Sequence, residues 1–343
     1  MKVSQYSSLK DFNSFALDIQ TRRLEIASSL ADLLRACVDA CMSSEATLVL
    51  GGGSNVLFTE DFDGTVLING LKGIEVQETG KEYKLHVAAG ESWPALVDWT
   101  VAQGFAGLEN LALIPGSAGA APIQNIGAYG VELAQRCDYV DFLSLEDRKV
   151  HRLMASDCRF GYRDSIFKGE LAGKAIITAI GLTLSKDWQP EISYGPLQSA
   201  FAEGQAISAS AIRDTVVAIR RAKLPDPALL GNAGSFFKNP TITTEEYEAL
   251  QARYPNLPGY PLDNKRIKIP AGWLIDKAGW KGYRTGDAGV HAKQALVLVN
   301  HGHAKPGELL SLARAIKDDI FGKFAVDLVP EVRLIGASGE IPF

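Results

Sequence analysis

Cysteine is scarce in this 343-residue chain, and the four that occur show no pattern typical of a disulfide-stabilised fold. Cys37, Cys41, Cys137 and Cys158 form no CxxC pair, so we expect buried, reduced thiols. Long apolar runs are also missing, because none approaches the roughly 18 residues that a membrane helix needs. The N-terminal residues lack the positive-then-apolar pattern of a signal peptide. We therefore expect a cytoplasmic protein with no membrane partner.

An excess of basic residues is absent as well. The chain has 35 Lys and Arg against 40 Asp and Glu, which gives a net charge of −5 at pH 7. No overall positive field is available to attract a phosphate backbone, so nucleic acid is not expected as a partner. With 46% apolar and 22% charged residues, the composition is that of a globular protein. The length suggests two or three domains of about 150 residues each.

Several common site motifs are missing too. Gly51-Gly52-Gly53 is followed by Ser, Asn and Val, so the GxGxxG fingerprint of a Rossmann fold is absent. The segment 169–174 is one residue short of a P-loop, and Ala175 stands where Ser or Thr would bind magnesium. The histidines form no HExxH and have no carboxylate at zinc-ligand spacing. We expect no metal site.

Hydrophobic periodicity predicts a chain of mixed helices and strands. Helices are predicted over 30–41, 93–103, 211–222, 244–253, 271–278 and 306–321. Strands are predicted over 47–50, 56–58, 65–68, 74–77, 83–88, 139–145, 176–184, 295–299 and 332–335. Two prolines directly after Lys223-Leu224 end a helix and predict a domain junction. The stretch that ends at Pro270 is predicted to be a proline-rich loop.

Two glycine-rich segments are candidates for ligand binding. Gly51 to Asn55 follows a predicted strand and can turn backbone N–H groups toward an anion, because glycine permits positive φ and close approach. Taken alone, an ordinary β-turn explains that segment better. The segment 115–130 is more specific, since small residues, amide side chains and two prolines are typical of a loop around a flat ligand. Its alternative is a buried crossover loop.

Three further residues stand in contexts that suit chemistry. Arg163, beside a tyrosine in a turn-prone segment, fits bidentate capture of a carboxylate or phosphate, although an isolated arginine is ordinarily a surface charge. Ser235, between Gly234 and two phenylalanines, lacks the GxSxG elbow of a hydrolase, so its hydroxyl could instead donate a proton. Glu331, at the final predicted strand, would ordinarily be a strand-end charge.

Five segments in this order resemble the UDP-N-acetylenolpyruvoylglucosamine reductase family: GGGSN, PGSAGAAPIQNIGAYG, GYRDS, GNAGSFFKNP and PEVR. The resemblance runs from about Phe12 to the end of the sequence. It implies an α+β chain, in which a two-subdomain FAD-binding fold of the vanillyl-alcohol-oxidase type precedes a C-terminal α+β substrate-binding domain. The expected divisions are 1–70, completed by about 330–343, then 71–224 and 225–329.

The resemblance also implies a reaction. Family members reduce UDP-N-acetylglucosamine enolpyruvate to UDP-N-acetylmuramate with FAD and NADPH, a step in peptidoglycan synthesis on which cell shape and division depend. No histidine or cysteine lies in either glycine-rich segment, so FAD is expected to be non-covalent. Hydride addition to the enolpyruvyl methylene leaves negative charge that Arg163 and Glu331 would stabilise, the latter if it is protonated or shares a hydrogen bond. Ser235 would then protonate the adjacent carbon. We expect a monomer.

The resemblance assigns the remaining contacts residue by residue. Expected cofactor contacts are Gly51, Gly52, Gly53, Ser54, Asn55, Pro115, Gly116, Ser117, Gly119, Gln124, Asn125, Gly127, Ala128 and Tyr162. Expected substrate contacts are Tyr194, Lys223, Asn239, Tyr260 and Gln294. The stretch of about 241–285, with Tyr260 and Trp273, looks like the tyrosine-bearing loop that closes over the UDP moiety in longer family members.

Two other functions stay open at this point. An oxidase of the same fold could act on an alcohol or a sugar lactone with oxygen as acceptor, although the paired motifs of Ser235 and Glu331 argue against it. A nucleotide-sugar binding protein could hold FAD only structurally, or not at all. A yellow colour of the purified protein would indicate bound flavin.

Overall fold

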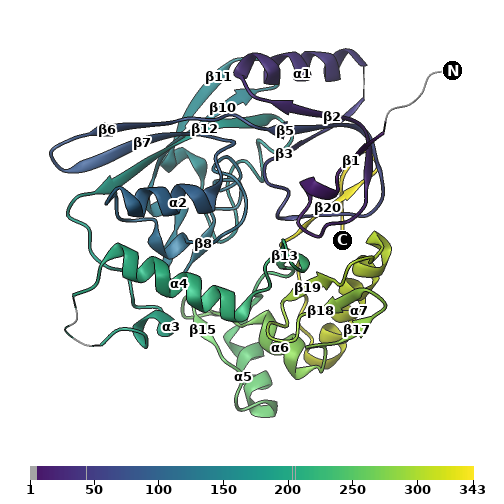
Figure 1. Ribbon diagram of the computed structural model, residues 1–343. Coiled ribbons are helices and arrows are strands. Elements are labelled where there is room, and N and C mark those ends of the chain that lie inside the picture. Colours follow the sequence, from purple (N-terminus) through teal and green to yellow (C-terminus); the bar gives the residue numbers. More distant parts are fainter. Residues whose placement is uncertain (1–5, 44, 203, 205) are drawn as a thin grey trace. The chain divides into compact units, whose positions relative to one another are not determined.

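A computed structural model describes residues 6–43, 45–202, 204 and 206–343 (Figure 1). The contacts divide the chain into two units. Unit 1 takes the residues up to Arg22, then Gly53–Asp63 and Lys223–Phe343, and unit 2 takes Arg23–Gly52 and Gly64–Ala222. The chain therefore passes between the units several times. The division at 1–70, 71–224 and 225–329 stays a prediction.

Unit 2 is built on a five-stranded antiparallel sheet with the order β11-β10-β12-β7-β6. Its strands are β6 (Ile74–Glu78), β7 (Glu82–Ala88), β10 (Cys137–Ser144), β11 (Val150–Met154) and β12 (Ala175–Ser185). β12 is buried along most of its length because it lies in the centre of the sheet and is rich in apolar residues. The helices α2 (Trp93–Ala102) and α4 (Ala209–Lys223) contribute buried residues such as Trp93 and Val216 to the same core.

A second part of unit 2 pairs β3 (Ala46–Leu50) in parallel with β5 (Phe62–Asn69), from Ala46 opposite Gly64 to Leu50 opposite Ile68. The helix α1 (Leu30–Ser43) packs Leu33 and Ala36 into a small apolar cluster with residues of β2 (Gln20–Ala27), β5, β10 and β12. Ser29 caps the N-terminal end of the helix, because its Oγ accepts a hydrogen bond from the N–H of Asp32 at 3.2 Å. The predicted helix is confirmed.

Unit 1 holds three small sheets, with the orders β13-β19-β18-β17, β21-β20-β4 and β14-β16-β15. Their strands are β4 (Val56–Phe58), β13 (Gly231–Ser235), β14 (Thr241–Thr243), β15 (Tyr260–Pro261), β16 (Arg266–Lys268), β17 (Arg284–Thr285), β18 (Ala288–Val290), β19 (Val297–Asn300), β20 (Arg333–Gly336) and β21 (Gly339–Ile341). The helices are α5 (Thr244–Arg253), α6 (Ala271–Lys277) and α7 (Pro306–Phe324). α7 buries Leu309, Ile316 and Ile320, the stripe that its spacing predicts.

Short elements complete the structure. They are β1 (Ser7–Ser8), η1 (Lys10–Phe12), η2 (Glu109–Leu111), β8 (Gly127–Ala128), β9 (Val131–Glu132), η3 (Leu133–Gln135), η4 (Ala155–Cys158) and α3 (Gly195–Gln198). Among the helices that the structure describes, none combines the length and apolar character that crossing a bilayer requires.

The main error of the sequence analysis lies between Thr241 and Pro270. We predicted a helix followed by a proline-rich loop, but β14, β15 and β16 form a three-stranded antiparallel sheet around α5. Each strand has only two or three residues, too few for an alternating pattern to be visible. The other predicted helices and strands are confirmed to within a few residues at their ends, and the α+β class is confirmed.

Candidate functional site

The two glycine-rich segments meet in unit 2, where backbone packs directly on backbone. A Cβ on Gly51 would lie 2.3 Å from Oγ of Ser117, and one on Gly52 would lie 3.1 Å from Cα of Gly116. Gly119 approaches the end of β7 in the same way, since its Cβ would lie 2.5 Å from Cβ of Ala89. Larger residues would force these loops apart, so the sequence needs glycine at this contact.

Hydrogen bonds hold the second segment in place. The N–H of Ala118 donates to the carbonyl of Glu91 at 2.8 Å, and the N–H of Gly119 donates to the carbonyl of Ala89 at 2.8 Å. Ser117 is 7% exposed, and among the described residues its Oγ has no hydrogen-bond partner. A buried hydroxyl without a hydrogen-bond partner is rare and points to a ligand atom that can accept a hydrogen bond from it. The contact between the two glycine-rich segments therefore fits an anionic or polar part of a cofactor, as the resemblance predicts for FAD.

The GYRDS segment is fastened to the same loop. Gly161 and Asp164 close a tight turn with two backbone hydrogen bonds, and Arg163 takes φ 53° within it. Nη2 of Arg163 donates to the carbonyl of Gly127 at 3.0 Å, and Nδ2 of Asn125 donates to the carbonyl of Gly161 at 3.1 Å. Two segments that we singled out separately thus form one structure. Their contact orients the guanidinium of Arg163.

A second guanidinium, which the sequence analysis missed, belongs to Arg220 on α4. Burial lowers the pKa of Arg220, and the charge of Arg163 lowers it further, while Tyr129 raises it through charge and a hydrogen bond. Burial in turn raises the pKa of Tyr129. Nε of Arg220 is buried and has no partner among the described residues. Two neighbouring cations of this kind suit a carboxylate or a phosphate.

Aromatic residues border this cation pair. The ring of Tyr194 packs edge-on against that of Tyr129, with the centroids 5.6 Å apart, and Tyr194 is 48% exposed.

The sequence contained one signal that could have identified Arg220 as a candidate site residue. Arg220 precedes Lys223, a predicted substrate contact, by three residues and so lies on the same helix face.

In unit 1, Ser235 and Glu331 are linked through one residue. Phe236 donates its N–H to the carbonyl of Leu296 at 2.8 Å, and its carbonyl accepts the N–H of Glu331 at 2.8 Å. Ser235 ends β13, where the pairing with β19 is irregular after Asn232, and Gly234 takes φ 70°. The chain therefore turns sharply just before Ser235, which only glycine permits without strain.

Asn55 is joined to the same region. Its Nδ2 donates to the carbonyl of Glu331 at 3.1 Å, and its own carbonyl accepts the N–H of Arg333 at 3.1 Å. The reason is the parallel pairing of β4 with β20, which sets Val56 opposite Arg333. Gly53 is as tightly packed, since a Cβ there would lie 1.9 Å from the carbonyl oxygen of Phe12. Arg333 itself pairs with Glu340 at 2.8 Å.

Among the predicted substrate contacts, Asn239 and Gln294 are brought together at the start of α6. Oδ1 of Asn239 accepts the N–H of Ala271 at 3.0 Å, and a Cβ on Gly272 would lie 3.1 Å from Oε1 of Gln294. Lys223 lies at the end of α4 and is exposed. Tyr260 lies on β15 and is 55% exposed, so it is accessible to a ligand.

The other predicted cofactor contacts lie in loops or at loop edges. Tyr162 is 41% exposed, with the guanidinium of Arg163 5.6 Å from its ring centroid. Gly127 and Ala128 form β8. Ser54 and Gln124 are partly buried in loops, and Pro115 is exposed in a loop.

In the described part of the chain, no group of three or more His, Cys, Asp or Glu could hold a metal ion. Cys137 and Cys158 are free thiols in the core, and Cys37 is a partly buried residue of α1. Burial raises the pKa of Cys137 to about 12 and that of Cys158 to about 11. The side chain of Cys41 lies outside the described residues.

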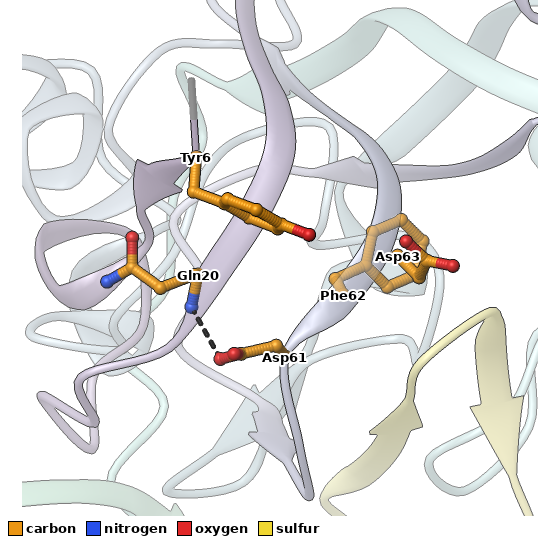
Figure 2. Close-up of a pocket in the computed structure, with 5 residues that line it drawn as sticks. All are labelled: Tyr6, Gln20, Asp61, Phe62 and Asp63. Atoms are coloured by element: carbon orange, nitrogen blue, oxygen red, sulfur yellow. Dashed lines mark hydrogen bonds between the residues drawn. The ribbon is translucent and has the colours of Figure 1, made fainter. Parts of the chain in front are cut away.

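Unit 1 also has a surface pocket of about 390 Å³, lined by Tyr6, Gln20, Asp61, Phe62 and Asp63. Figure 2 shows the N–H of Gln20 directed at Asp61, which accepts it at 2.8 Å. Asp63 pairs with Arg22. None of the residues predicted for catalysis or cofactor binding lines this pocket.

Comparisons with known proteins agree with the geometry. Residues 23–153 match a family model described as an FAD binding domain, and residues 226–335 match the C-terminal domain of UDP-N-acetylenolpyruvoylglucosamine reductase. Reductases of that name from Vibrio cholerae are 48% identical over 99% of this chain and 97% of the relative. One from Shewanella is 50% identical over 97% of both chains.

A solved structure supports the fold. The crystal structure of the Thermus caldophilus UDP-N-acetylenolpyruvylglucosamine reductase superposes with a TM-score of 0.63 over 96% of this chain and 98% of the other, at 24% identity. The family models and the relatives of 48–50% identity confirm the resemblance found in the sequence motifs. The chain belongs to the family of UDP-N-acetylenolpyruvoylglucosamine reductases and is an FAD-dependent oxidoreductase.

Proposed function

We propose that this protein reduces UDP-N-acetylglucosamine enolpyruvate to UDP-N-acetylmuramate, with NADPH as the hydride donor and FAD bound without a covalent link. The observation that carries the proposal is the identity of 48% to reductases so named, over 99% of the chain. The product is a peptidoglycan precursor, so the protein serves cell-wall synthesis and through it cell shape and division. We further propose that it works in the cytoplasm as a monomer.

FAD would be held by the cradle of Gly51, Gly52, Gly116 and Ser117. The glycines let the backbone approach a cofactor closely, and the buried Oγ of Ser117 fits a phosphate oxygen. Neither glycine-rich segment contains a histidine or cysteine, which supports a non-covalent cofactor. Bound FAD supplies the redox chemistry, transfer of a hydride from NADPH to the enolpyruvyl methylene carbon.

The cations of unit 2 would hold the substrate carboxylate. When the methylene carbon gains a hydride, the double bond breaks and its electron pair moves to the adjacent carbon and into the carboxylate. Arg163 is already oriented by Gly127, and Arg220 lies near enough for their charges to interact. Donors held in place before the reaction stabilise such a developing charge without a cost of reorganisation. Glu331, if protonated, would add a hydrogen bond.

Ser235 would complete the reaction as the proton donor. An enolate-like carbon is basic enough to take a proton from a hydroxyl, and solvent then replaces that proton. The overall balance is one hydride and one proton added across the double bond, with NADPH oxidised to NADP⁺. Tyr194, Lys223, Asn239, Tyr260 and Gln294 would contact the nucleotide-sugar part. These contacts and the closing of the loop around Tyr260 are part of the proposal.

Anaerobic stopped-flow absorbance of the flavin tests this function in two half-reactions. NADPH should bleach the flavin, and the enolpyruvyl sugar should restore it. In Ser235→Ala, bleaching should stay normal while recovery slows by about 10²–10⁴-fold, the usual contribution of a general acid. Ser185→Ala, which removes an exposed hydroxyl at the end of β12, is the matched control.

Three results would contradict parts of the proposal. Bleaching by NADPH without recovery by the sugar would exclude the substrate. If oxygen, admitted in a separate run, restored the flavin and the sugar did not, an oxidase would be favoured. Normal recovery in Ser235→Ala would exclude Ser235 as the proton donor while leaving the reductase function in place.

A further inference from the structure

Three phenylalanine rings form a cluster beside Ser235 in unit 1. Phe236 and Phe237 follow Ser235 in the sequence and are buried, with 0% and 1% of their surface exposed. Their ring centroids are 5.1 Å apart. The ring of Phe343, from a distant part of the chain, completes the cluster at 6.2 Å from Phe236 and 5.9 Å from Phe237. The tilted and edge-on arrangements are those that aromatic rings prefer.

The backbone beneath this cluster carries both proposed catalytic groups. The N–H and the carbonyl of Phe236 are bonded to Leu296 and to Glu331, each at 2.8 Å. Phe237 forms an isolated β-bridge with Pro330, and Lys238 donates its N–H to the carbonyl of Val329 at 2.9 Å. The segments that carry Ser235 and Glu331 are therefore one hydrogen-bonded strip. A shift of Phe236 would displace both groups.

Contacts outside the ring cluster also hold Phe343 in place. It follows β21, which pairs with β20 from Leu334 opposite Ile341 to Gly336 opposite Gly339. The ammonium of Lys317 lies 5.6 Å from the Phe343 ring centroid, and Lys317 pairs with Asp327 at 2.9 Å. Phe343 is only partly buried, unlike its two ring partners. Its contribution to core burial is therefore the smallest of the three.

We propose that Phe343 is a positioning residue for the reduction of the substrate. Its ring fixes Phe236 and Phe237, and through them the strip that carries Ser235 and Glu331. This inference rests on the proposed function, in which Ser235 donates the proton that completes the reaction. Because a displacement of about 1 Å can slow a reaction by about 100-fold, a modest loosening of this strip should be visible in the rate.

The test uses the FAD-loaded protein in the same two half-reactions. In Phe343→Ala, bleaching by NADPH should keep the wild-type rate, whereas recovery by the enolpyruvyl sugar should slow by about 10–100-fold. The solvent deuterium isotope effect on recovery should rise, because proton delivery becomes slower. Phe343→Tyr, which keeps the ring, should restore the rate. Phe343→Leu carries the same test if the alanine variant does not fold.

Two controls separate positioning from general damage. Ile320→Ala removes a fully buried side chain of α7 in the same unit, so it should lower the melting temperature and leave recovery unchanged. In a Ser235→Ala background, Phe343→Ala should have a smaller further effect on recovery, since one of the two groups that it positions is gone.

The outcomes discriminate the two proposals. Wild-type recovery in folded Phe343→Ala, or full additivity with Ser235→Ala, would overturn the positioning role and leave the reductase function standing. Equal slowing of both half-reactions, with the same pattern in Ile320→Ala, would also overturn it. A wild-type protein whose flavin the sugar does not restore would overturn the proposed function itself.

Discussion

Removal of one hydroxyl, in Ser117→Ala, should change the stability of the FAD-free protein and its affinity for FAD in opposite directions. Ser117 is 7% exposed, and its Oγ has no hydrogen-bond partner among the described residues. Leaving a buried polar group unsatisfied costs about 1–3 kcal/mol. Alanine removes that cost, so the FAD-free variant should be more stable than wild type by about 1 kcal/mol, or roughly 1–2 °C in melting temperature for a chain of this length.

The sign reverses with FAD bound. If the hydroxyl donates to a charged phosphate oxygen, its loss removes about 1.5–3 kcal/mol of binding free energy. Because 1.4 kcal/mol corresponds to a factor of ten, the dissociation constant for FAD should rise by about 10–100-fold. Thermal melts of the FAD-free protein and titration of FAD by calorimetry measure the two effects separately.

Thr100→Val is the control for this prediction. Thr100 is also fully buried, but its Oγ1 already donates to the carbonyl of Val97 at 2.9 Å. Its loss should therefore destabilise the FAD-free protein by about 1 kcal/mol and leave the FAD affinity unchanged. A Ser117→Ala variant that is less stable without FAD, or that binds FAD as tightly as wild type, would refute the reasoning.

Three further predictions follow from packing and titration. Gly119→Ala should lower the unfolding free energy by about 1–3 kcal/mol and weaken FAD binding, because the new Cβ would lie 2.5 Å from that of Ala89. Chemical denaturation measures the first effect and FAD titration the second. Cys137 and Cys158 should resist alkylation at pH 8, because burial raises their pKa to about 12 and about 11, and mass spectrometry would detect any adduct. Burial lowers the pKa of His291, so the unfolded state binds its proton first and stability should fall as the pH drops below about 6.5. Melting curves of His291→Gln should show a shallower loss.

The glycine and cysteine predictions each have a control experiment. A Cβ on Gly169 would meet its nearest neighbours only at 3.8 and 3.9 Å, so Gly169→Ala should be nearly neutral. The denatured protein should alkylate at both buried cysteines. Prompt alkylation of the folded protein, or a wild-type slope between stability and pH in His291→Gln, would contradict the assignments.

The raised cysteine pKa values also predict the alkaline side of the stability curve. A thiol whose pKa is higher in the folded state stabilises the fold below its unfolded value, and that contribution is lost as the pH rises toward the folded value. For Cys137 the range runs from the ordinary 9.0 to about 12. Cys137→Ala should therefore be less sensitive to alkaline unfolding than wild type.

Local structure could be predicted from the sequence because it depends on near neighbours. The apolar stripe of α7, the Ser29 cap of α1 and the alternation in β7 all follow from contacts a few residues apart. The three strands between Thr241 and Lys268 could not, because each is too short to show a period and forms only by pairing with the others.

The glycine-rich segments, Arg163 and Ser235 were recognisable as residue types in unusual surroundings, and their order identified the family. Only the tertiary structure decided what each one touches. Gly51 needs glycine because Ser117, far along the chain, occupies the space for a Cβ. Arg220, on an ordinary amphipathic helix, becomes notable only when folding buries it beside Arg163. Contacts of this kind join distant segments, and a local sequence pattern carries no record of them.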